Sequence, residues 1–196
     1  MDTNRNLRVL TESALCVALA TILSLITLFH MPLGGSVTAF STLPVIIVSL
    51  RHGTKWGIGS ALVFSLTQLL LGMANVTAVP VKNLESMILC ALLDYVLAYT
   101  VLGFTGVIAR SIDKRGLGLS VAILATGCGR LACSFFSGIV IWGSFTPDGW
   151  SVELYSLAYN AAWCLPDTLI ALAACLLLAR VRMFGLLPTE KTTVMN

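Results

Sequence analysis

The sequence predicts an all-α integral membrane protein, with six transmembrane helices packed as a single membrane domain over residues 1–196. The first observation is composition: 57% of the residues are hydrophobic, 11% are charged and the mean hydropathy is +0.92, whereas soluble domains carry about 25% charged residues. The second is a series of apolar runs, several of them near the roughly 20 residues that cross a bilayer. The third is that basic residues fall in alternate connections between those runs.

The first apolar run follows Arg5 and Arg8. It is too long for the apolar part of a signal peptide and no small-residue cleavage site follows it, so we interpret it as the first span. The second expected helix is short and contains Pro44, and the fourth follows the polar loop "ANVTAVPVKN". The expected helices cover about 10–29, 39–51, 55–73, 84–109, 117–142 and 158–181.

The loop "HMPLGGSVT" separates the first two expected helices. Two adjacent glycines allow a tight turn or a close approach of the backbone. Irregular backbone at membrane depth is tolerated where protein shields it or where it lines a cavity. Two interpretations are open, a re-entrant or capping loop at the outer face and an ordinary glycine turn.

The distribution of charge predicts the orientation. With six spans, one side holds Lys82 together with three acids, and Arg130 lies inside a helix. The other side holds the remaining basic residues: Arg5, Arg8, Arg51, Lys55, Arg110, Lys114, Arg115, Arg180, Arg182 and Lys191. By the positive-inside rule, both termini are expected in the cytoplasm. No basic block indicates a nucleic-acid partner.

Ionisable residues within the spans indicate a site, because such residues usually face the bundle interior and mark pathways or ligands. Asp94 lies about ten residues into the fourth helix, or about 15 Å from its outer end. Arg130 lies at a similar depth in the fifth helix. Either the two form a structural ion pair, or Asp94 binds a ligand and Arg130 tunes it. Asp167, which follows Pro166, is given no role.

Aromatic side chains gather near the outer end of the last two helices. They are Trp142, Trp150 and Tyr155, followed by the amide of Asn160, and Tyr95 is next to Asp94. A carboxylate, an amide and aromatic rings together would suit a flat cation. Tyr155 and Asn160 are five residues apart, which does not place them on one stripe of a regular helix. We therefore expect Tyr155 in the loop or in the first helical turn.

The sequence does not predict an enzyme, a cofactor or a metal site. His30 and His52 both fall in loops, so no intramembrane Ser–His pair is indicated. The six cysteines lie in apolar segments without a C-x-x-C pair, which is typical of small buried side chains. The sequence has no phosphate-binding loop, so any ATP that drives transport is hydrolysed by a partner; the alternative energy source is an ion gradient.

Four blocks carry a resemblance to a known family: "LTESALCVALATILSL", "MPLGGSVTAFSTLPVIIVSLRHGTKWG", "LLDYVLAYTVLGFTG" and "FFSGIVIWGSFTPDGWSVELYSLAYN". In their order and spacing the chain resembles the thiamine-specific substrate-binding (S) component of energy-coupling factor (ECF) vitamin transporters. The resemblance implies a six-helix bundle in a prokaryotic plasma membrane, with a thiamine pocket near the outer face. The implied partners are a transmembrane scaffold subunit and two ATPase subunits.

The resemblance also assigns residues. The family's pocket acid corresponds to Asp94, with Tyr95 beside it, and its stacking tryptophan corresponds to Trp142. Its pocket tyrosine and asparagine correspond to Tyr155 and Asn160, and the small residues that contact the scaffold correspond to Ala14 and Ala18. Thiamine is then expected with its thiazolium near Asp94 and its rings against Trp142 and Tyr155. Tyr95 and Asn160 would offer hydrogen bonds, and the glycine loop would cap the site.

Two positions depart from the family pattern and remove aromatic surface. Ser134 stands where the family usually has a histidine, eight residues before the pocket tryptophan, and Gly35 stands where some relatives carry a loop tryptophan. A thiamine precursor or analogue, or another vitamin, is therefore an alternative ligand for an S component. The remaining alternative is a standalone ion-coupled carrier in which Asp94 and Arg130 form the coupling relay.

Overall fold

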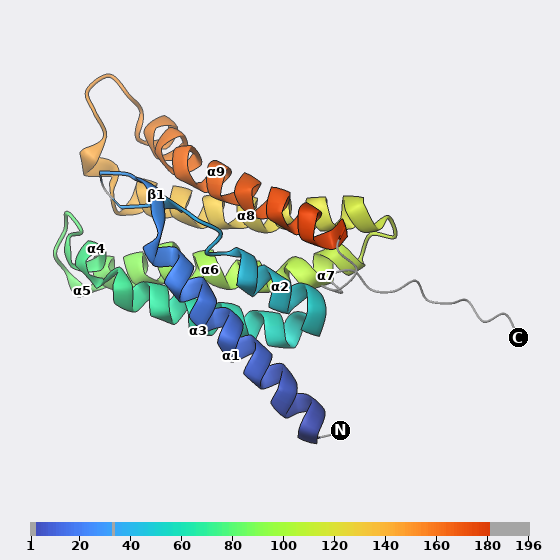
Figure 1. The fold of residues 1–196 in the computed structure, drawn as a ribbon. Coiled ribbons are helices and arrows are strands. Elements are labelled where there is room, and N and C mark those ends of the chain that lie inside the picture. The colour runs from blue at the N-terminus through green and yellow to red at the C-terminus, as the bar shows by residue number, and fades with distance from the viewer. Residues whose placement is uncertain (1–2, 33, 181–196) are drawn as a thin grey trace, which may run out of the picture.

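The computed structural model describes residues 3–32 and 34–180. Most of this part of the chain is helical and runs lengthwise in one bundle (Figure 1). The main helices are α1 (Thr3–Leu25), α2 (Leu43–His52), α3 (Thr54–Leu71), α8 (Arg115–Val140) and α9 (Val152–Arg180). A further long helix between α3 and α8 is built from α5 (Leu84–Cys90), the π-helix η1 (Ala91–Leu97), α6 (Ala98–Thr100), the 3₁₀ helix η2 (Val101–Phe104) and α7 (Thr105–Arg110).

Four helices in the described residues are long and apolar enough to cross a membrane: Asn4–Ser24, Leu84–Arg110, Gly116–Val140 and Val152–Arg180. α2 is apolar but shorter. It begins with Pro44 in its first turn, where the missing N–H costs no intrahelical bond. Six crossings and cytoplasmic termini remain predictions from the charge pattern.

The core lies where α1, α2 and α3 meet the α5–α7 helix, α8 and α9. Phe64 of α3 is fully buried there and meets the ring of Tyr99 edge to face, with 5.3 Å between the centroids. Ser49 of α2 donates to the carbonyl of Gly103 at 2.6 Å and accepts from the amide of Gly106 at 2.8 Å. A Cβ at Gly106 would lie 2.1 Å from the Ser49 carbonyl oxygen. Glycine therefore allows two helices to hydrogen-bond across a close contact.

The first helix ends earlier than expected. α1 stops at Leu25, and β1 (Thr27–His30) pairs antiparallel with β2 (Ser36–Thr38). The expected helix end at residue 29 was wrong, because residues 27–30 form backbone hydrogen bonds across the hairpin instead of within a helix. The two glycines make the turn, with φ of +93° at Gly34 and +79° at Gly35. The "GGSVT" segment thus contributes a strand of a hairpin at one end of the bundle (Figure 1).

The last helix begins at Val152, six residues before the expected start at 158. The Ser151 hydroxyl accepts from the amide of Leu154 and its carbonyl accepts from the amide of Tyr155, which extends the helix toward the loop. Tyr155 is therefore in the first turn of α9. The short helices α4 (Met73–Thr77) and η3 (Gly143–Phe145) lie within segments expected to be loops.

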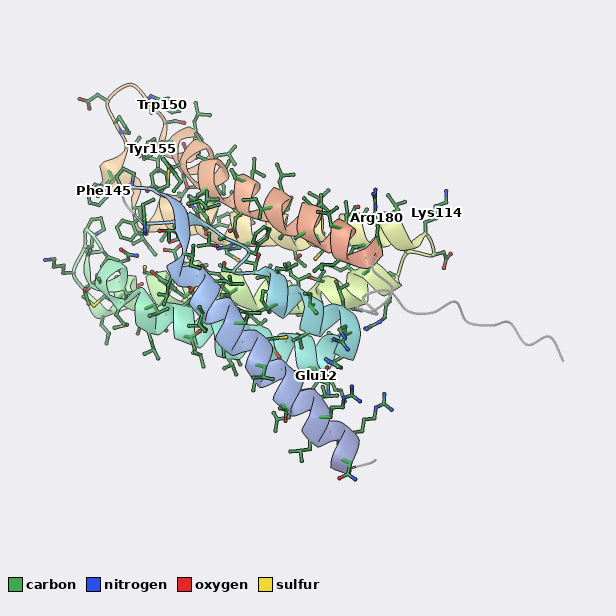
Figure 2. The ribbon with its side chains drawn as sticks, viewed as in Figure 1. Glu12, Lys114, Phe145, Trp150, Tyr155 and Arg180 are labelled. Carbon is green, nitrogen blue, oxygen red and sulfur yellow. The ribbon has the colours of Figure 1, made fainter. Side chains whose placement is uncertain are left out.

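The two ends of the bundle differ. α1 begins and α9 ends at one end, beside the α2–α3 and α7–α8 connections, while the hairpin, α4 and η3 lie at the other (Figure 1). The basic residues of the first end include Lys114 and Arg180, whereas Phe145 and Trp150 mark the opposite end (Figure 2). Arg182 and Lys191 lie outside the described residues.

Candidate ligand-binding site

A cavity of about 230 Å³ lies at the hairpin end of the bundle, between the hairpin, α3, the α5–α7 helix, α8 and α9. Its walls combine aromatic rings with amides, hydroxyls and one carboxylate. The residues predicted to bind a substrate all line it: Asp94, Tyr95, Ser134, Trp142, Tyr155 and Asn160. The fold therefore brings together side chains that lie up to 66 positions apart, from Asp94 to Asn160.

Asp94 lies on the π-helical segment η1, and such segments are frequent at functional sites. Its Oδ2 atom accepts from the Ser137 hydroxyl at 2.6 Å, from Trp142 Nε1 at 3.3 Å and from the Cys90 thiol at 3.4 Å. Among residues 3–32 and 34–180, no protein group donates to Oδ1 and no cation pairs with the carboxylate. The carboxylate is thus held by neutral donors on one oxygen and keeps its charge uncompensated beside the cavity.

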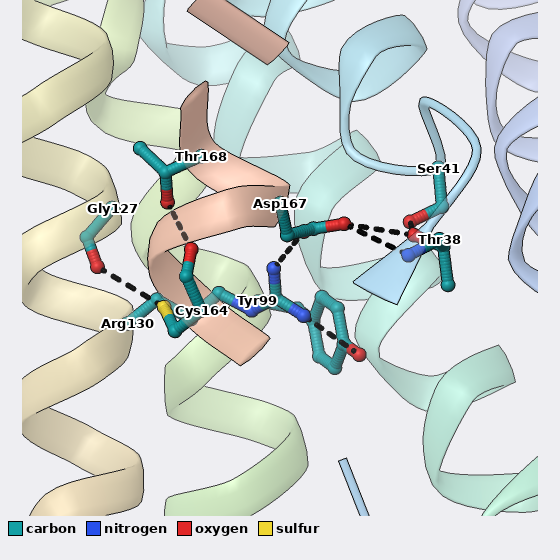
Figure 3. A network of polar contacts seen from close by, with 8 residues as sticks. All are labelled: Thr38, Ser41, Tyr99, Gly127, Arg130, Cys164, Asp167 and Thr168. Atoms are coloured by element: carbon teal, nitrogen blue, oxygen red, sulfur yellow. Dashed lines mark hydrogen bonds and ion pairs between the residues drawn. The ribbon is translucent and has the colours of Figure 1, made fainter. Parts of the chain in front are cut away.

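Arg130 does not pair with Asp94, so of the two alternatives for Asp94 the structural ion pair between the fourth and fifth helices is wrong. Its guanidinium pairs with Asp167 of α9 and donates to the Tyr99 hydroxyl at 3.1 Å (Figure 3). Ser137, which does reach Asp94, is seven residues further along α8, or about 10 Å nearer the hairpin end. Arg130 therefore lies too deep to meet Asp94. It locks α8 to α9 instead.

The ion pair also holds the hairpin. Asp167 accepts Arg130 on Oδ2, and its Oδ1 accepts from the Thr38 amide at 3.3 Å and the Thr38 hydroxyl at 2.9 Å. Thr38 is the last residue of β2, and its hydroxyl also contacts Ser41 (Figure 3). Asp167, which the sequence left without a role, thus joins a buried ion pair to the segment that covers the cavity.

Rings from two helices form the floor of the cavity. Tyr99 and Trp163 both line it, and the Arg130 guanidinium carbon lies 4.5 Å and 4.9 Å from their ring centroids. These cation–π contacts spread one charge over two aromatic walls. Neither ring was singled out from the sequence. Trp163 carried a signal, since it follows Asn160 by three residues and so lies near it on the helix surface.

The remaining predicted polar groups already have protein partners. The Tyr95 hydroxyl donates to the Gly72 carbonyl at 3.2 Å and accepts from Asn75 at 3.3 Å. The Asn160 amide nitrogen donates to the carbonyls of Ser156 at 2.9 Å and Ser134 at 3.2 Å, and its oxygen accepts from Trp163 at 3.3 Å. Both side chains therefore help to fix the walls of the cavity.

The outer rim is aromatic. The Trp142 ring lies 6.0 Å from Phe145, and the Tyr155 ring lies between Trp150 at 6.2 Å and Tyr159 at 5.9 Å. The Tyr159 hydroxyl donates to the Gly34 carbonyl at 2.9 Å, which ties the hairpin turn to α9. No group of three metal-ligating side chains occurs in the described part of the chain. The cavity thus combines one carboxylate with aromatic rings and neutral hydrogen-bonding groups.

Comparison with known proteins identifies the family. The model of the family described as thiamine transporter protein (Thia_YuaJ) matches residues 10–184. The chain belongs to this family. It is 34% identical to the thiamine transporter ThiT of Bacillus subtilis, over 90% of this chain and 93% of that protein. It is 25% identical to the thiamine transporter ThiT of Lacticaseibacillus paracasei, over 88% and 87% of the two chains.

The fold also has a solved counterpart. The structure of ThiT from Listeria monocytogenes matches with a TM-score of 0.75 and 23% identity, covering 94% of this chain and all of that one. Together with its apolar helices, membership in this transporter family makes the chain a multi-pass protein of the cell membrane.

The structure explains one departure from the family pattern. A Cβ at Gly35 would lie 2.7 Å from Nε1 and 2.9 Å from Cδ1 of Trp163, so the indole of α9 occupies the space beside the hairpin turn. The turn at Gly35 therefore packs against the Trp163 ring, which itself lines the cavity. Ser134 is 3% exposed and lines the cavity through a smaller side chain than histidine. A counterpart to the missing imidazole is not evident among the described residues.

The two alanines expected to meet a scaffold lie on α1. Ala14 and Ala18 are both exposed and are four residues apart, so they share one stripe of the helix. Small side chains at this spacing let helices approach closely in a membrane. The contact itself remains a prediction.

Proposed function

We propose that this protein is the substrate-binding S component of an ECF-type importer and that its ligand is thiamine. Membership in the thiamine transporter family and the two relatives named as thiamine transporters support the choice of ligand. The observation that carries the proposal is Asp94, a carboxylate beside the cavity without a protein cation among the described residues. Such a charge is costly near the middle of a membrane unless a ligand compensates it.

Thiamine joins a cationic thiazolium to an aminopyrimidine, and the cavity offers complementary groups for both. The free Oδ1 of Asp94 attracts the positive charge and accepts a hydrogen bond, while Ser137 and Trp142 hold Oδ2 in place. Because Asp94 is partly withdrawn from water, the attraction is stronger than it would be in solution. Trp142 and Tyr155 supply faces for stacking, which suits flat cationic rings.

The vitamin enters from outside in this proposal. The cavity lies at the end of the bundle opposite Lys114 and Arg180, and by the positive-inside rule that more basic end faces the cytoplasm. The bundle then crosses the membrane six times and both termini are cytoplasmic. The hairpin, bonded to α9 at Gly34 and Thr38, covers the loaded cavity.

Energy comes from partners in this proposal. The sequence has no phosphate-binding loop, so two ATPase subunits and a transmembrane scaffold drive the transport step. The exposed stripe of Ala14 and Ala18 is the proposed contact with the scaffold. The chain itself is not an enzyme and uses no cofactor.

Titration of the purified protein with thiamine tests the proposal, with tryptophan fluorescence as the readout because Trp142 and Trp163 both line the cavity. We expect saturable quenching at a ligand concentration far below 1 mM, on the order of micromolar or lower. Failure to bind at millimolar thiamine would exclude this ligand while leaving the fold unaffected. Tighter binding of the isolated pyrimidine or thiazole half would favour a precursor as the ligand.

Reconstitution separates an S component from a standalone carrier. Proteoliposomes that contain this chain alone should bind thiamine without accumulating it, under either a proton or a sodium gradient. Gradient-driven accumulation would instead assign the coupling to the chain itself. The Arg130–Asp167 pair argues against a coupling relay of Asp94 and Arg130, since Arg130 is paired with Asp167 rather than with Asp94.

A further inference from the structure

A second concave site lies at the end of the bundle opposite the cavity. It is a cleft of about 570 Å³ between the first turns of α1, the end of α2 and the start of α3. α1 reaches beyond α2 and α3 at this end (Figure 1), and Glu12 marks the α1 wall (Figure 2). The charged and aromatic side chains of the cleft are Arg5, Arg8, Glu12, Arg51, His52 and Trp56.

The cleft carries excess positive charge. Glu12 accepts from Arg8 at 3.1 Å, from His52 at 2.9 Å and lies 3.8 Å from Arg51. The lining holds the guanidinium groups of Arg5, Arg8 and Arg51 and one carboxylate among the described residues, which is an excess of two positive charges without counting His52. Glu12 contacts Arg8 and Arg51 without balancing the positive charge of the cleft, so the cleft is suited to an anion.

Each wall of the cleft continues into an exposed apolar stripe. On α1, positions 8, 12, 15, 19 and 22 recur at the three- and four-residue spacing of one helix face. The last three positions are Leu15, Leu19 and Ile22, exposed at 67%, 50% and 59%. On α3, the seven-residue spacing from Trp56 leads to the exposed Val63 and Leu70. Phosphate-binding groups therefore join surfaces that suit acyl chains.

We propose that this cleft binds the phosphate headgroup of an anionic membrane phospholipid, with its acyl chains along the α1 and α3 stripes. Arginine forks match phosphate oxygens, and basic pockets between helices on the cytoplasmic side bind anionic headgroups. Trp56 occupies the interfacial position that tryptophan favours. A free phosphate would use the arginines, but it would leave the apolar stripes without a role.

The headgroup part of this site is compatible with the proposed scaffold contact. Ala14 follows Glu12 by two residues, which places it about 200° around the helix. A partner that docks on Ala14 and Ala18 therefore leaves the charged groups of the cleft free. Ala18 is three residues from Leu15 and four residues from Ile22, so this partner and the acyl chains would share part of the α1 surface. The lipid site does not depend on thiamine or on the transport partners.

Native mass spectrometry of the purified, delipidated chain tests this site directly. The probes are dioleoylphosphatidylglycerol and dioleoylphosphatidylcholine, which share acyl chains and differ in headgroup charge. We expect at least tenfold tighter binding of the phosphatidylglycerol. The double variant Arg5→Gln/Arg8→Gln, which changes exposed side chains, should weaken that binding about 30-fold, as expected for two interfacial cations.

The matched control is Lys114→Gln/Arg180→Gln, which removes the same charge at the same end of the bundle but outside the cleft (Figure 2). It should change phosphatidylglycerol binding by less than about twofold, in line with diffuse surface charge. Equal binding of the two lipids, or an equal loss in the control variant, would overturn the proposal. Displacement of the lipid by millimolar inorganic phosphate would overturn it in favour of a free-anion site.

Discussion

Replacing Asp94 with asparagine removes the charge that distinguishes this cavity while keeping the shape of the side chain. The asparagine oxygen can still accept from the Ser137 hydroxyl and Trp142 Nε1, which now bond Oδ2 at 2.6 Å and 3.3 Å. The packing of the π-helical segment should therefore survive. What disappears is the electrostatic partner of a cationic ligand.

The expected cost follows from the burial of that partner. Removing one member of a desolvated charge pair costs about 2–5 kcal/mol. Asp94 is half-buried rather than sealed, so the lower part of that range applies, about 2–3 kcal/mol. Thiamine affinity should fall about 30- to 140-fold, because each 1.4 kcal/mol is a factor of ten.

The assay is equilibrium titration with thiamine and with an analogue whose thiazolium is replaced by a neutral ring. The charge argument predicts that the analogue binds the variant and the unmodified protein within about threefold, since no ion pair is lost. Asp148→Asn is the control, because it removes an acid from the exposed outer loop. Unchanged thiamine affinity in a folded Asp94→Asn protein would refute the role of this carboxylate.

Three further predictions concern the walls of the cavity and the hairpin. Asp167→Asn leaves Arg130 buried without its ionic partner, so the free energy of unfolding in detergent should fall by about 3–5 kcal/mol and the melting temperature by at least about 6 °C. A decrease below about 1 kcal/mol would contradict a stabilising role of this ion pair. Gly35→Ala should reduce the stability, measured by thermal melting, by about 1–3 kcal/mol more than Gly149→Ala does, because both glycines have positive φ but only Gly35 lies against Trp163. Equal losses of stability would mean that the contact with Trp163 does not matter. Thr38→Val removes a hydroxyl bond between the hairpin and Asp167, so stopped-flow fluorescence should show thiamine leaving about 3- to 10-fold faster. An unchanged dissociation rate would mean that this bond does not hold the hairpin over the ligand.

The membrane class could be predicted because it depends on properties that are local in sequence. Apolar runs must satisfy their backbone hydrogen bonds within the lipid, which requires helices wherever the run faces the bilayer. Asp94 was recognisable as a candidate site residue for the same reason, since a carboxylate in such a run is costly without a function. The resemblance then brought Tyr95, Trp142, Tyr155 and Asn160 into the same predicted site, and all of them line the cavity.

The partners of those residues could not be predicted, because they depend on depth and on the rotation of one helix against another. Arg130 and Asp94 have similar depths by residue count, yet Arg130 meets Asp167. Asn160 was expected to serve a ligand, whereas its amide already bonds Ser134, Ser156 and Trp163. Each pairing joins segments that are distant in sequence, and residue types do not specify which of several donors comes within 3 Å.

The sequence by itself determined that the chain is a membrane protein, where most of its long helices lie, and that the carboxylate of Asp94 falls within an apolar helix. It could do so because hydropathy and charge are properties of individual residues. The tertiary structure alone decided that residues 27–30 leave the helix for a hairpin, that the Trp163 ring lies against Gly35, and that Asp94 keeps one oxygen free of protein donors among the described residues. It also placed Arg5, Arg8 and Arg51 around one glutamate at the opposite end. The reason is physical: cavities and clefts arise between elements, and their contents depend on how helices from distant parts of the chain pack together.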